Sequence, residues 1–308
     1  MTLIQPPLMV TGGIHPARAL RMMVRDLSRG SQGITEGGDL KVRSTPTPGP
    51  GVRVGNGSAI IRGATWGQGS YTQYNSGDHL VPIAPTGGTG RTDLLVLRVE
   101  DPEYEGSRNP SSEDIGYFHV IPGVSATTAA PPPGMTAIAL ARITQPPNCQ
   151  TITNAMITDL RTLANPRRER RVRTIQTFKY SSIPSSPTWQ DWPASAGAKV
   201  DIDIPYWATN AAVITTLHGL RVAASVNVAF RNVLGGSPGS DAYLDTDAIT
   251  TVSRADITMV DHYSFRQEQR GTTQTLAVQS VRLDVSGNVD VNNTTTLSAD
   301  VDFVEDVY

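Results

Sequence analysis

Residues 49–75 and 81–105 read GPGVRVGNGSAIIRGATWGQGSYTQYN and VPIAPTGGTGRTDLLVLRVEDPEYE, and this stretch decides the fold class. Short runs of Val, Ile and Leu alternate in it with dense Gly, Pro and Asn. Turn residues of these types supply the backbone angles that connect short strands. The pattern therefore predicts a small β-barrel or sandwich, in which LLVLRV (94–99) is apolar enough to be a central strand buried on both faces.

The bulk composition narrows the class of protein. The chain has 308 residues, a length that suggests two domains of about 100–200 residues each. Hydrophobic residues make up 38% and charged residues 18%, so the apolar material must be spread over thin β layers. A net charge of −2 lacks the basic excess expected of a nucleic-acid binder. The single Cys149 rules out an intrachain disulfide framework and a Cys-based zinc site.

The N-terminal residues 1–15 are apolar and contain proline, and they are predicted to form an extended arm. They lack a positively charged start and a long apolar core, so no signal peptide is expected there. No run in the sequence approaches the ~18 apolar residues that suggest a membrane helix, so membrane insertion is not expected.

Residues 16–29 form the best helix candidate of the sequence. Pro16 suits the first helical turn, and Gly30 suits the position after the last one. Spacing of i, i+3, i+4 and i+7 gives an apolar stripe of Leu20, Met23, Val24 and Leu27. The other face carries Arg18, Arg21, Arg25 and Arg29. These arginines are interpreted as a solvated face or, alternatively, as an ion-pairing surface for another subunit.

A second helix is predicted over residues 154–164, because its apolar residues would share one side. The run RRERRVR (167–173) follows and is the only real charge run. It is interpreted as a basic linker, residues 166–175, that pairs with acidic neighbours; a nucleic-acid or membrane contact is the alternative for such a run. Four of its side chains are candidate subunit-interface residues, namely Arg167, Arg168, Arg170 and Arg171.

The second half of the chain changes to strict alternation of apolar and polar residues. Clear examples are the segments 199–204, 280–285 and 297–303. Alternation of this kind indicates antiparallel strands with one buried and one solvated face. Residues 176–308 are therefore predicted to form an antiparallel β-sandwich of jelly-roll-like type. The whole chain is expected to be mainly β, with an N-terminal β-barrel or sandwich-like module that includes two short helices.

The sequence offers few traces of catalysis. The histidines have no metal-binding spacing, and there is no GxSxG element. Gly63, Gly67 and Gly69 resemble half of a dinucleotide loop, but no long helix follows, so they are interpreted as turns. Acidic pairs such as Asp300 and Asp302 lie on the predicted wet face of a strand, where charge is expected anyway. No enzymatic activity, no cofactor and no metal site are therefore expected.

Four aromatic residues of the second half form a candidate site. They are Trp189, Trp192, Tyr206 and Trp207, in PTWQDWP and IPYWAT. Flat aromatic faces stack on sugar rings, so contact with a glycan is one interpretation. The favoured interpretation is that these rings hold the edge of the sandwich, with each indole N–H bonded at a turn.

The first half of the chain, about residues 15–170, resembles the N-terminal module of minor tail or baseplate proteins from tailed phages of actinobacteria. The resemblance rests on the order of SRGSQGI, GGDLKV, PGVRVGNGSAIIRG, QGSYTQYN, RTDLLVLRVEDPEY, ALARI, ITDLR and PRR. Each motif alone carries little information. The second half is similar, more loosely, to the β-sandwich that often follows in such proteins.

This resemblance to upper-type baseplate proteins implies a structural protein of the virion, located in the phage tail and assembled in the host cytoplasm. The implied partners are copies of itself, as a homotrimer, and other tail or baseplate proteins. Residues 1–165 would attach to the tail, and residues 176–308 would face outward. An adaptor role is favoured; recognition of host cell-wall glycans is the alternative, and a wall-degrading hydrolase is a third candidate.

Overall fold

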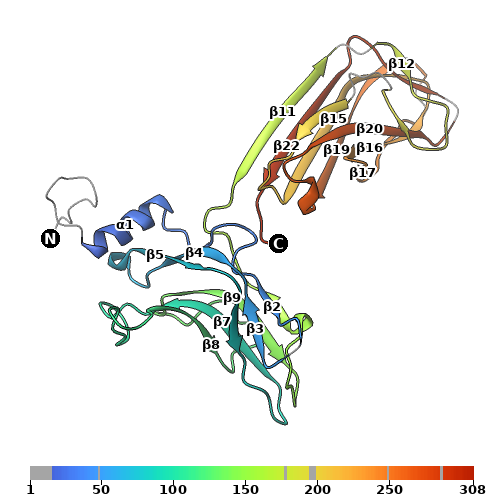
Figure 1. The fold of residues 1–308 in the computed structure, drawn as a ribbon. Helices are drawn as coiled ribbons and strands as arrows, with labels where there is room; N and C mark the ends of the chain where they lie inside the picture. Colours follow the sequence, from blue (N-terminus) through green and yellow to red (C-terminus); the bar gives the residue numbers. More distant parts are fainter. Residues whose placement is uncertain (1–15, 48, 177–178, 194–198, 248–249, 285–286) are drawn as a thin grey trace. The chain divides into compact units, whose positions relative to one another are not determined.

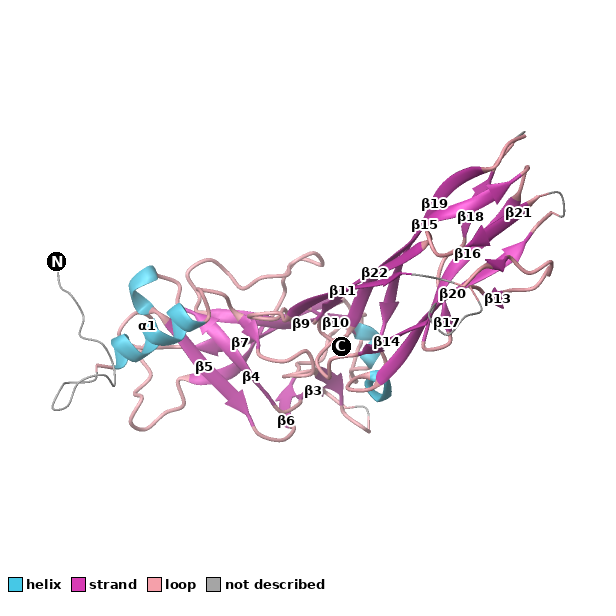
Figure 2. Ribbon diagram, turned by 90° about the horizontal axis from the view of Figure 1, so that it is seen from above, coloured by secondary structure: helices cyan, strands magenta, loops and turns pink. Residues whose placement is uncertain are grey.

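The computed structural model describes residues 16–47, 49–176, 179–193, 199–247, 250–284 and 287–308 (Figure 1). The arm expected over residues 1–15 lies outside these residues. The chain divides into two compact units: unit 1 comprises residues 1–166 and 307–308, and unit 2 comprises residues 167–306. Strands are the main regular secondary structure of each unit (Figure 2), which confirms the prediction of a mainly β protein.

Unit 1 contains three antiparallel sheets, with strand orders β1-β4-β5, β2-β3-β6 and β10-β9-β7-β8. Its elements are α1 (Ala17–Leu27), β1 (Gly33–Ile34), β2 (Val42–Ser44), β3 (Gly51–Val54), β4 (Gly57–Arg62), η1 (Trp66–Gln68), β5 (Ser70–Asn75), β6 (His79–Pro82), β7 (Arg91–Val99), β8 (Gly116–Ile121), β9 (Ala137–Gln145), η2 (Asn154–Met156) and β10 (Ile157–Asp159).

The sheets of unit 1 share one hydrophobic core. Ile61 of β4, Val52 of β3 and Ile143 of β9 are all fully buried in it. β7 is the predicted central strand: Leu95 packs into this core, while Leu94 packs into a smaller cluster on the other face. A strand buried on both faces needs a nearly continuous apolar run, which the sequence supplies. The prediction for residues 94–99 is therefore confirmed.

The helix predicted over residues 154–164 is wrong. The segment forms the short 3-10 helix η2 and then β10, which pairs with the edge of β9 from Ile157↔Ile143 to Asp159↔Ala141. Its apolar residues divide between two clusters, with Ile157 packed against the main core and Leu160 against the smaller one. Apolar residues on both sides suit a strand better than a one-sided helix, and the free edge of β9 supplies the partner.

Unit 2 is built from two antiparallel sheets. One has the order β11-β22-β15-β21-β12 with β19 paired to β15, and the other has the order β13-β20-β16-β17 with β14 paired to β20 and β18 to β16. The elements are β11 (Arg168–Gln176), β12 (Ser181–Ser182), β13 (Gln190–Asp191), β14 (Lys199–Asp203), β15 (Asn210–Ala223), β16 (Asn227–Leu234), β17 (Ser237–Pro238), β18 (Ala242–Asp245), β19 (Ser253–Ser264), η4 (Gln267–Gln269), β20 (Thr273–Arg282), β21 (Asn288–Val291) and β22 (Thr296–Val304).

The apolar faces of these two sheets pack on each other. In β22, the four alternating residues Leu297, Ala299, Val301 and Phe303 are buried, whereas the residues between them are half-buried. One cluster joins Leu217 of β15 to Phe230 of β16 and Val278 of β20, which belong to different sheets. The predicted β-sandwich with one buried and one solvated face is therefore confirmed.

The basic linker expected at residues 166–175 is a strand instead. β11 pairs with β22 over its whole length, from Arg168↔Val304 to Gln176↔Thr296 (Figure 1). The predicted ion pairing with acidic neighbours is present: Arg168 Nε donates to Asp302 at 2.9 Å, and Arg170 Nε donates to Asp300 at 2.8 Å. Because these carboxylates neutralise the arginines, the charge run can form a strand of the sheet.

Candidate functional site

Two arginines of α1, Arg18 and Arg21, pack against the rest of unit 1 instead of facing solvent. Arg18 Nε donates to the carbonyl of Gly67 at 2.7 Å, and Arg21 Nε donates to that of Gln68 at 2.9 Å. The Arg21 guanidinium also lies 3.2 Å from Asp101 and 2.6 Å from Glu103. Only 13% of the Arg21 side chain is exposed. The interpretation of Arg21 as part of a solvated face is therefore wrong.

Tyr71 and Tyr104 complete the surroundings of Arg21, whose guanidinium lies 5.6 and 5.4 Å from the two ring centroids. The Tyr71 hydroxyl donates to Asp101 at 2.7 Å, and burial together with this bond raises the pKa of Tyr71. The arginine thus lies among two carboxylates and two aromatic rings, an arrangement that holds α1 in place. Of the apolar stripe, Leu27 is 75% exposed, whereas Leu20, Met23 and Val24 are half-buried.

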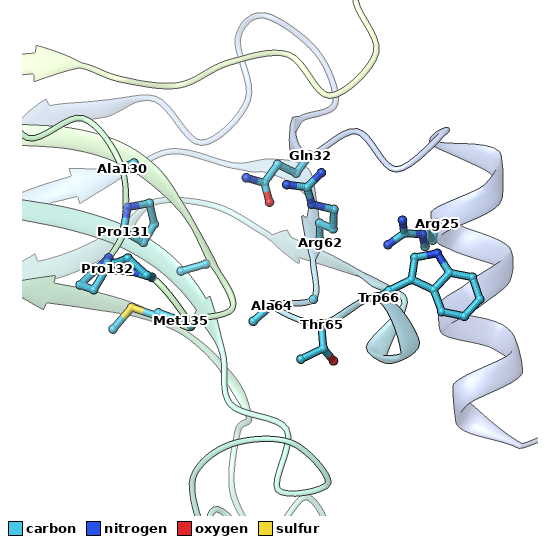
Figure 3. Close-up of a pocket in the computed structure, with 14 residues that line it drawn as sticks. Arg25, Gln32, Arg62, Ala64, Thr65, Trp66, Ala130, Pro131, Pro132 and Met135 are labelled. Atoms are coloured by element: carbon cyan, nitrogen blue, oxygen red, sulfur yellow. The ribbon is translucent and has the colours of Figure 1, made fainter.

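A cavity of about 410 Å³ opens beside this helix, as Figure 3 shows. One wall is the turn that carries Trp66, and the other wall is the loop of Pro131, Pro132 and Met135. Arg25 from α1 and Arg62 from the end of β4 lie on the side of the first wall. All the lining residues belong to unit 1.

Hydrogen bonds at the base join the two walls of this cavity. Thr136, which is fully buried, follows Met135 of the loop, and its hydroxyl oxygen accepts from Gln68 Nε2 at 3.0 Å and from the Ala64 N–H at 3.3 Å. Gln68 is also buried and donates to the Tyr71 hydroxyl at 3.1 Å. The position of each wall is therefore fixed by the other.

Glycines allow the Trp66 turn to pack closely against its supports. Gly69 has a φ of +79°, and a Cβ there would lie 2.6 Å from the backbone carbon of Arg21. A Cβ on Gly63 would lie 2.6 Å from the side chain of Gln68. The interpretation of these glycines as turns is confirmed, and their spacing reflects close approach of the backbone to α1 and Gln68.

Trp66 itself is held at the surface. Its side chain is 69% exposed, and the Arg25 guanidinium lies 5.6 Å from its ring centroid. Arg62 is exposed, and its Nη1 donates to the carbonyl of Gly30 at 3.4 Å. Arg29, the last arginine expected on the helix face, is exposed just after α1. The cavity therefore combines an accessible indole with two guanidinium groups.

The basic run makes its contacts inside unit 2. Arg167 bonds Glu305 at 2.8 Å, and its guanidinium lies 5.4 Å from the ring of Tyr206 and 5.7 Å from that of Trp207. Arg171 bonds Glu169 at 2.6 Å and the carbonyl of Asp203 at 2.6 Å. With Arg168 and Arg170 on Asp302 and Asp300, the four arginines of this run that were proposed for a subunit interface all have acidic partners within the chain.

The four aromatic residues proposed as a glycan contact do not form one site. Trp192 is 0% exposed, lies 6.0 Å from the ring of Phe230, and donates its indole N–H to the carbonyl of Ser182 at 2.9 Å. Trp189 lies against the guanidinium of Arg231 at 4.1 Å. Trp192 is thus part of the core and cannot touch a ligand in this fold.

Tyr206 and Trp207 lie in a different part of unit 2 from Trp192. Trp207 packs against the cluster that contains Phe303, whereas Trp192 belongs to the cluster that contains Phe230. Tyr206 remains 68% exposed beside Arg167. Because Trp192 and Trp207 pack in different clusters and Trp192 is buried, the four rings do not present a shared stacking surface.

Across the parts of the chain that the structure describes, no group of three or more His, Cys, Asp and Glu side chains is arranged to hold a metal ion. Over the same residues, no helix combines the length and the apolar character that crossing a bilayer would require.

The solvated face of one sheet in unit 2 carries an aliphatic row. Val172 of β11, Ile214 of β15 and Val260 of β19 are in register across the sheet, with Asp300 of β22 between the first two. Their exposed fractions are 59%, 40% and 64%. Residues opposite one another in register share a face, so the three side chains form one line. We call this surface the row face.

The polar groups around the row bond to one another. The Thr216 and Thr258 hydroxyls are 3.0 Å apart, and His218 lies 3.3 Å from Asp256 and 3.2 Å from the Ser298 hydroxyl. The bonds from Arg168 to Asp302 and from Arg170 to Asp300 lie on the same face. The row face therefore carries three exposed aliphatic side chains, and Arg168, Arg170 and His218 on it have acidic partners.

No protein-family model and no curated protein matches the chain. Solved structures give low similarity. A structure of the infectious bursal disease virus Gx strain has a TM-score of 0.26 at 10% identity, over 91% of this chain and 72% of that one. The VP2 subviral particle of the same virus gives 0.25 at 11% identity, over 90% and 75%. The insecticidal delta-endotoxin Cry8Ea1 of Bacillus thuringiensis gives 0.22 at 11% identity, over 89% and 51%. TM-scores of this size assign neither a family nor a function.

Sequence reasoning missed both the cavity and the row face. The cavity needs Arg25, Arg62, Trp66 and Pro131, which lie far apart in the chain and have no common spacing. The row face has a weak signal: Val172 and Val260 are apolar residues at positions where their strands otherwise place polar ones. Only the strand register shows that the two valines lie in one line.

Proposed function

We propose that this chain is a structural component of a virus particle that assembles with copies of itself through the row face of unit 2. The single observation that carries the proposal is the line of exposed Val172, Ile214 and Val260 in a sheet where Arg168, Arg170 and His218 already have acidic partners. Burying such a face removes aliphatic surface from water, while Arg168, Arg170 and His218 keep their acidic partners.

Self-association suits this surface better than capture of a charged partner. Arg168, Arg170 and His218 each have an acidic partner on the same face, so two copies brought together would not repel. Flat β-sheet faces with β-branched side chains pack on each other, as in β-sandwiches. The charged edge strand β11, by contrast, disfavours edge-to-edge pairing.

The finer placement rests on the sequence resemblance. The ordered motifs of the first half support a location in the tail tip or baseplate of a phage, with an adaptor role and three copies around the tail axis. Unit 1 would then attach to other tail proteins. On this proposal the chain acts by binding and not by catalysis, so it is not an enzyme.

The test is the oligomeric state of the full chain. We expect the unchanged protein to be an oligomer in size-exclusion chromatography with light scattering, and the double variant Val172→Lys/Val260→Lys to be a monomer. Tyr243→Lys is the matched control, because Tyr243 is 61% exposed on β18, in the other sheet of unit 2. An unchanged protein that stays monomeric at about 100 µM, or a folded double variant that stays oligomeric, would contradict the proposal.

A further inference from the structure

The Trp66 turn is supported more extensively than an exposed residue requires. Arg18 bonds the carbonyl of Gly67, Arg21 bonds that of Gln68, and the buried Gln68 side chain bonds Tyr71 and Thr136. These contacts surround a tryptophan that remains 69% exposed. Trp66 contributes little to the core, so the fold holds an accessible indole in one place. Rigid placement of an exposed aromatic ring is typical of a binding site.

The facing wall is rigid as well. Pro131, Pro132 and Pro133 follow one another, and proline rings fix the backbone φ. The loop ends at Thr136, whose hydroxyl oxygen accepts from Gln68 and Ala64 on the opposite wall. A ligand would therefore enter a cavity that already has its shape, which lowers the entropic cost of binding.

The chemistry of the lining is cationic and aromatic. Arg25 and Arg62 supply guanidinium groups, and Gln32 supplies an amide. None of the described lining residues is acidic. Guanidinium groups bind carboxylates and phosphates by paired hydrogen bonds, so the lining favours an anionic group next to a flat ring.

We propose that the cavity between Trp66 and Pro132 binds an anionic saccharide. A sugar ring stacks on the Trp66 indole, while its carboxylate or phosphate is held by Arg62 and Arg25. The Arg25 guanidinium lies 5.6 Å from the centroid of the indole, so an anionic group that it binds would lie next to that ring. Aromatic faces match the apolar C–H face of a sugar ring.

The size of the cavity favours a small ligand over an acidic segment of a protein. A volume of about 410 Å³ is near the low end of the ~300–1,000 Å³ that is usual for small-molecule sites. One or two sugar rings suit such a volume, whereas a docked protein segment buries a longer surface. The inference is independent of the assembly proposed above, because the cavity lies in unit 1 and the row face in unit 2.

The test uses the ¹⁵N-labelled full chain and its tryptophan indole signals. The sequence has four tryptophans, so the Trp66 signal is identified as the one that Trp66→Ala removes. Trigalacturonic acid and glucose 1-phosphate are the two anionic probes, one for a carboxylate source and one for a phosphate source. Maltotriose is the uncharged saccharide, and tetraglutamate is the acidic peptide. We expect the Trp66 signal to shift with at least one anionic saccharide and about tenfold more weakly with maltotriose.

Two pairs of variants separate the site from general effects. Arg62→Gln should weaken binding of the anionic saccharide about tenfold, whereas Arg266→Gln, with Arg266 80% exposed in unit 2, should leave it unchanged. Trp66→Ala lacks the reporter, so its binding is followed by saturation-transfer signals of the sugar. It should lose binding, and Tyr243→Ala should keep it.

Several results would overturn the inference. They are no shift of the Trp66 signal with either anionic saccharide, equal affinity for maltotriose, and tighter binding of tetraglutamate than of both sugars. Unchanged binding by a folded Arg62→Gln or Trp66→Ala variant would also overturn it, and circular dichroism establishes that each variant is folded. The oligomeric state is measured in the same samples, so loss of sugar binding is distinguished from loss of assembly.

Discussion

At the scale of single residues, arginine side chains hold much of unit 1 together. Arg161 is an example beside Arg21: its side chain is fully buried, bonds Asp159 at 2.7 Å, and donates to the carbonyls of Asp39 and Tyr308 at 2.5 and 3.3 Å. Arg161 lowers the pKa of Asp159 against the opposing effect of burial. A planar cation with five donors can satisfy several oxygens at once, which a lysine cannot do.

Replacement of Arg21 tests this role. Arg21→Ala should destabilise unit 1 by about 2 kcal/mol, because it leaves Asp101 largely buried with fewer donors and removes the bond to Gln68. Arg29→Ala is the matched control and should stay within about 0.5 kcal/mol, since Arg29 is exposed. Chemical denaturation gives both values, and equal stabilities of the two variants would contradict the role assigned to Arg21.

A second comparison separates a core tryptophan from a surface one. Trp192→Ala should cost about 3–5 kcal/mol in unit 2, because the ring is fully buried and its indole N–H bonds Ser182. Trp66→Ala should change the stability of unit 1 by no more than about 0.5 kcal/mol, because most of its side chain is already in water. Calorimetric unfolding of each variant measures the difference, and a large loss for Trp66→Ala would show that Trp66 is a structural residue.

At the scale of elements, β11 shows how a charge run becomes part of a sheet. Its residues alternate, so Arg168 and Arg170 lie on the row face, where β22 places Asp302 and Asp300. Cross-strand pairs of opposite charge stabilise an antiparallel ladder modestly. The formation of β11 therefore depends on its pairing with β22 more than on the β propensity of its own residues.

The arginine–aspartate pairs between β11 and β22 predict that the stability of unit 2 depends on pH. Hydrogen bonds from Arg170 and Arg168 lower the pKa of Asp300 and Asp302. Because their pKa is lower in the folded state, the two carboxylates stabilise unit 2 above about pH 4, the usual pKa of aspartate. This stabilisation is lost as the pH falls through the folded-state pKa.

The variant Asp300→Asn/Asp302→Asn removes this contribution. Its thermal midpoint should lie below that of the unchanged protein at about pH 6, and the gap should close as the pH falls below about 4. Asp245→Asn, an exposed residue of β18, is the control and should show no such pattern. A gap that is constant at every pH would contradict the assignment.

At the scale of the whole molecule, the last two residues belong to the first unit. Val307 packs against the core of unit 1, and the Tyr308 N–H donates to the carbonyl of Gly37 at 3.2 Å. Arg161 also bonds the Tyr308 carbonyl. Residues separated by most of the sequence are therefore joined at one place in unit 1.

Deletion of residues 307–308 should loosen unit 1 locally. Hydrogen exchange measured by mass spectrometry should become faster over residues 33–42 and 157–161, which contact the two residues directly or through Arg161. Exchange over β15 and β22 of unit 2 should stay the same, because their ladder is complete without residues 307–308. Faster exchange throughout both units would contradict this assignment.

Part of the fold, but neither the cavity nor the row face, could be predicted from single segments. Alternation in β14 and β22, the apolar run in β7 and the terminal signals of α1 were each sufficient. The segment 154–164 was predicted wrongly, because its apolar spacing fits a helix and a strand alike, and the free edge of β9 decided between them. The orientation of α1 was also predicted wrongly, because Arg21 meets two carboxylates that lie about eighty residues further along the chain.

The sequence by itself determined a mainly β protein with a β-sandwich in its second half, because the period of apolar residues along a strand is a local property. The tertiary structure alone decided which charges are paired, which tryptophans are buried and where a cavity opens. Trp66 is 69% exposed, whereas Trp192 is 0% exposed. Burial depends on residues distant in the chain, and only the strand register and the packing of the sheets bring those residues together.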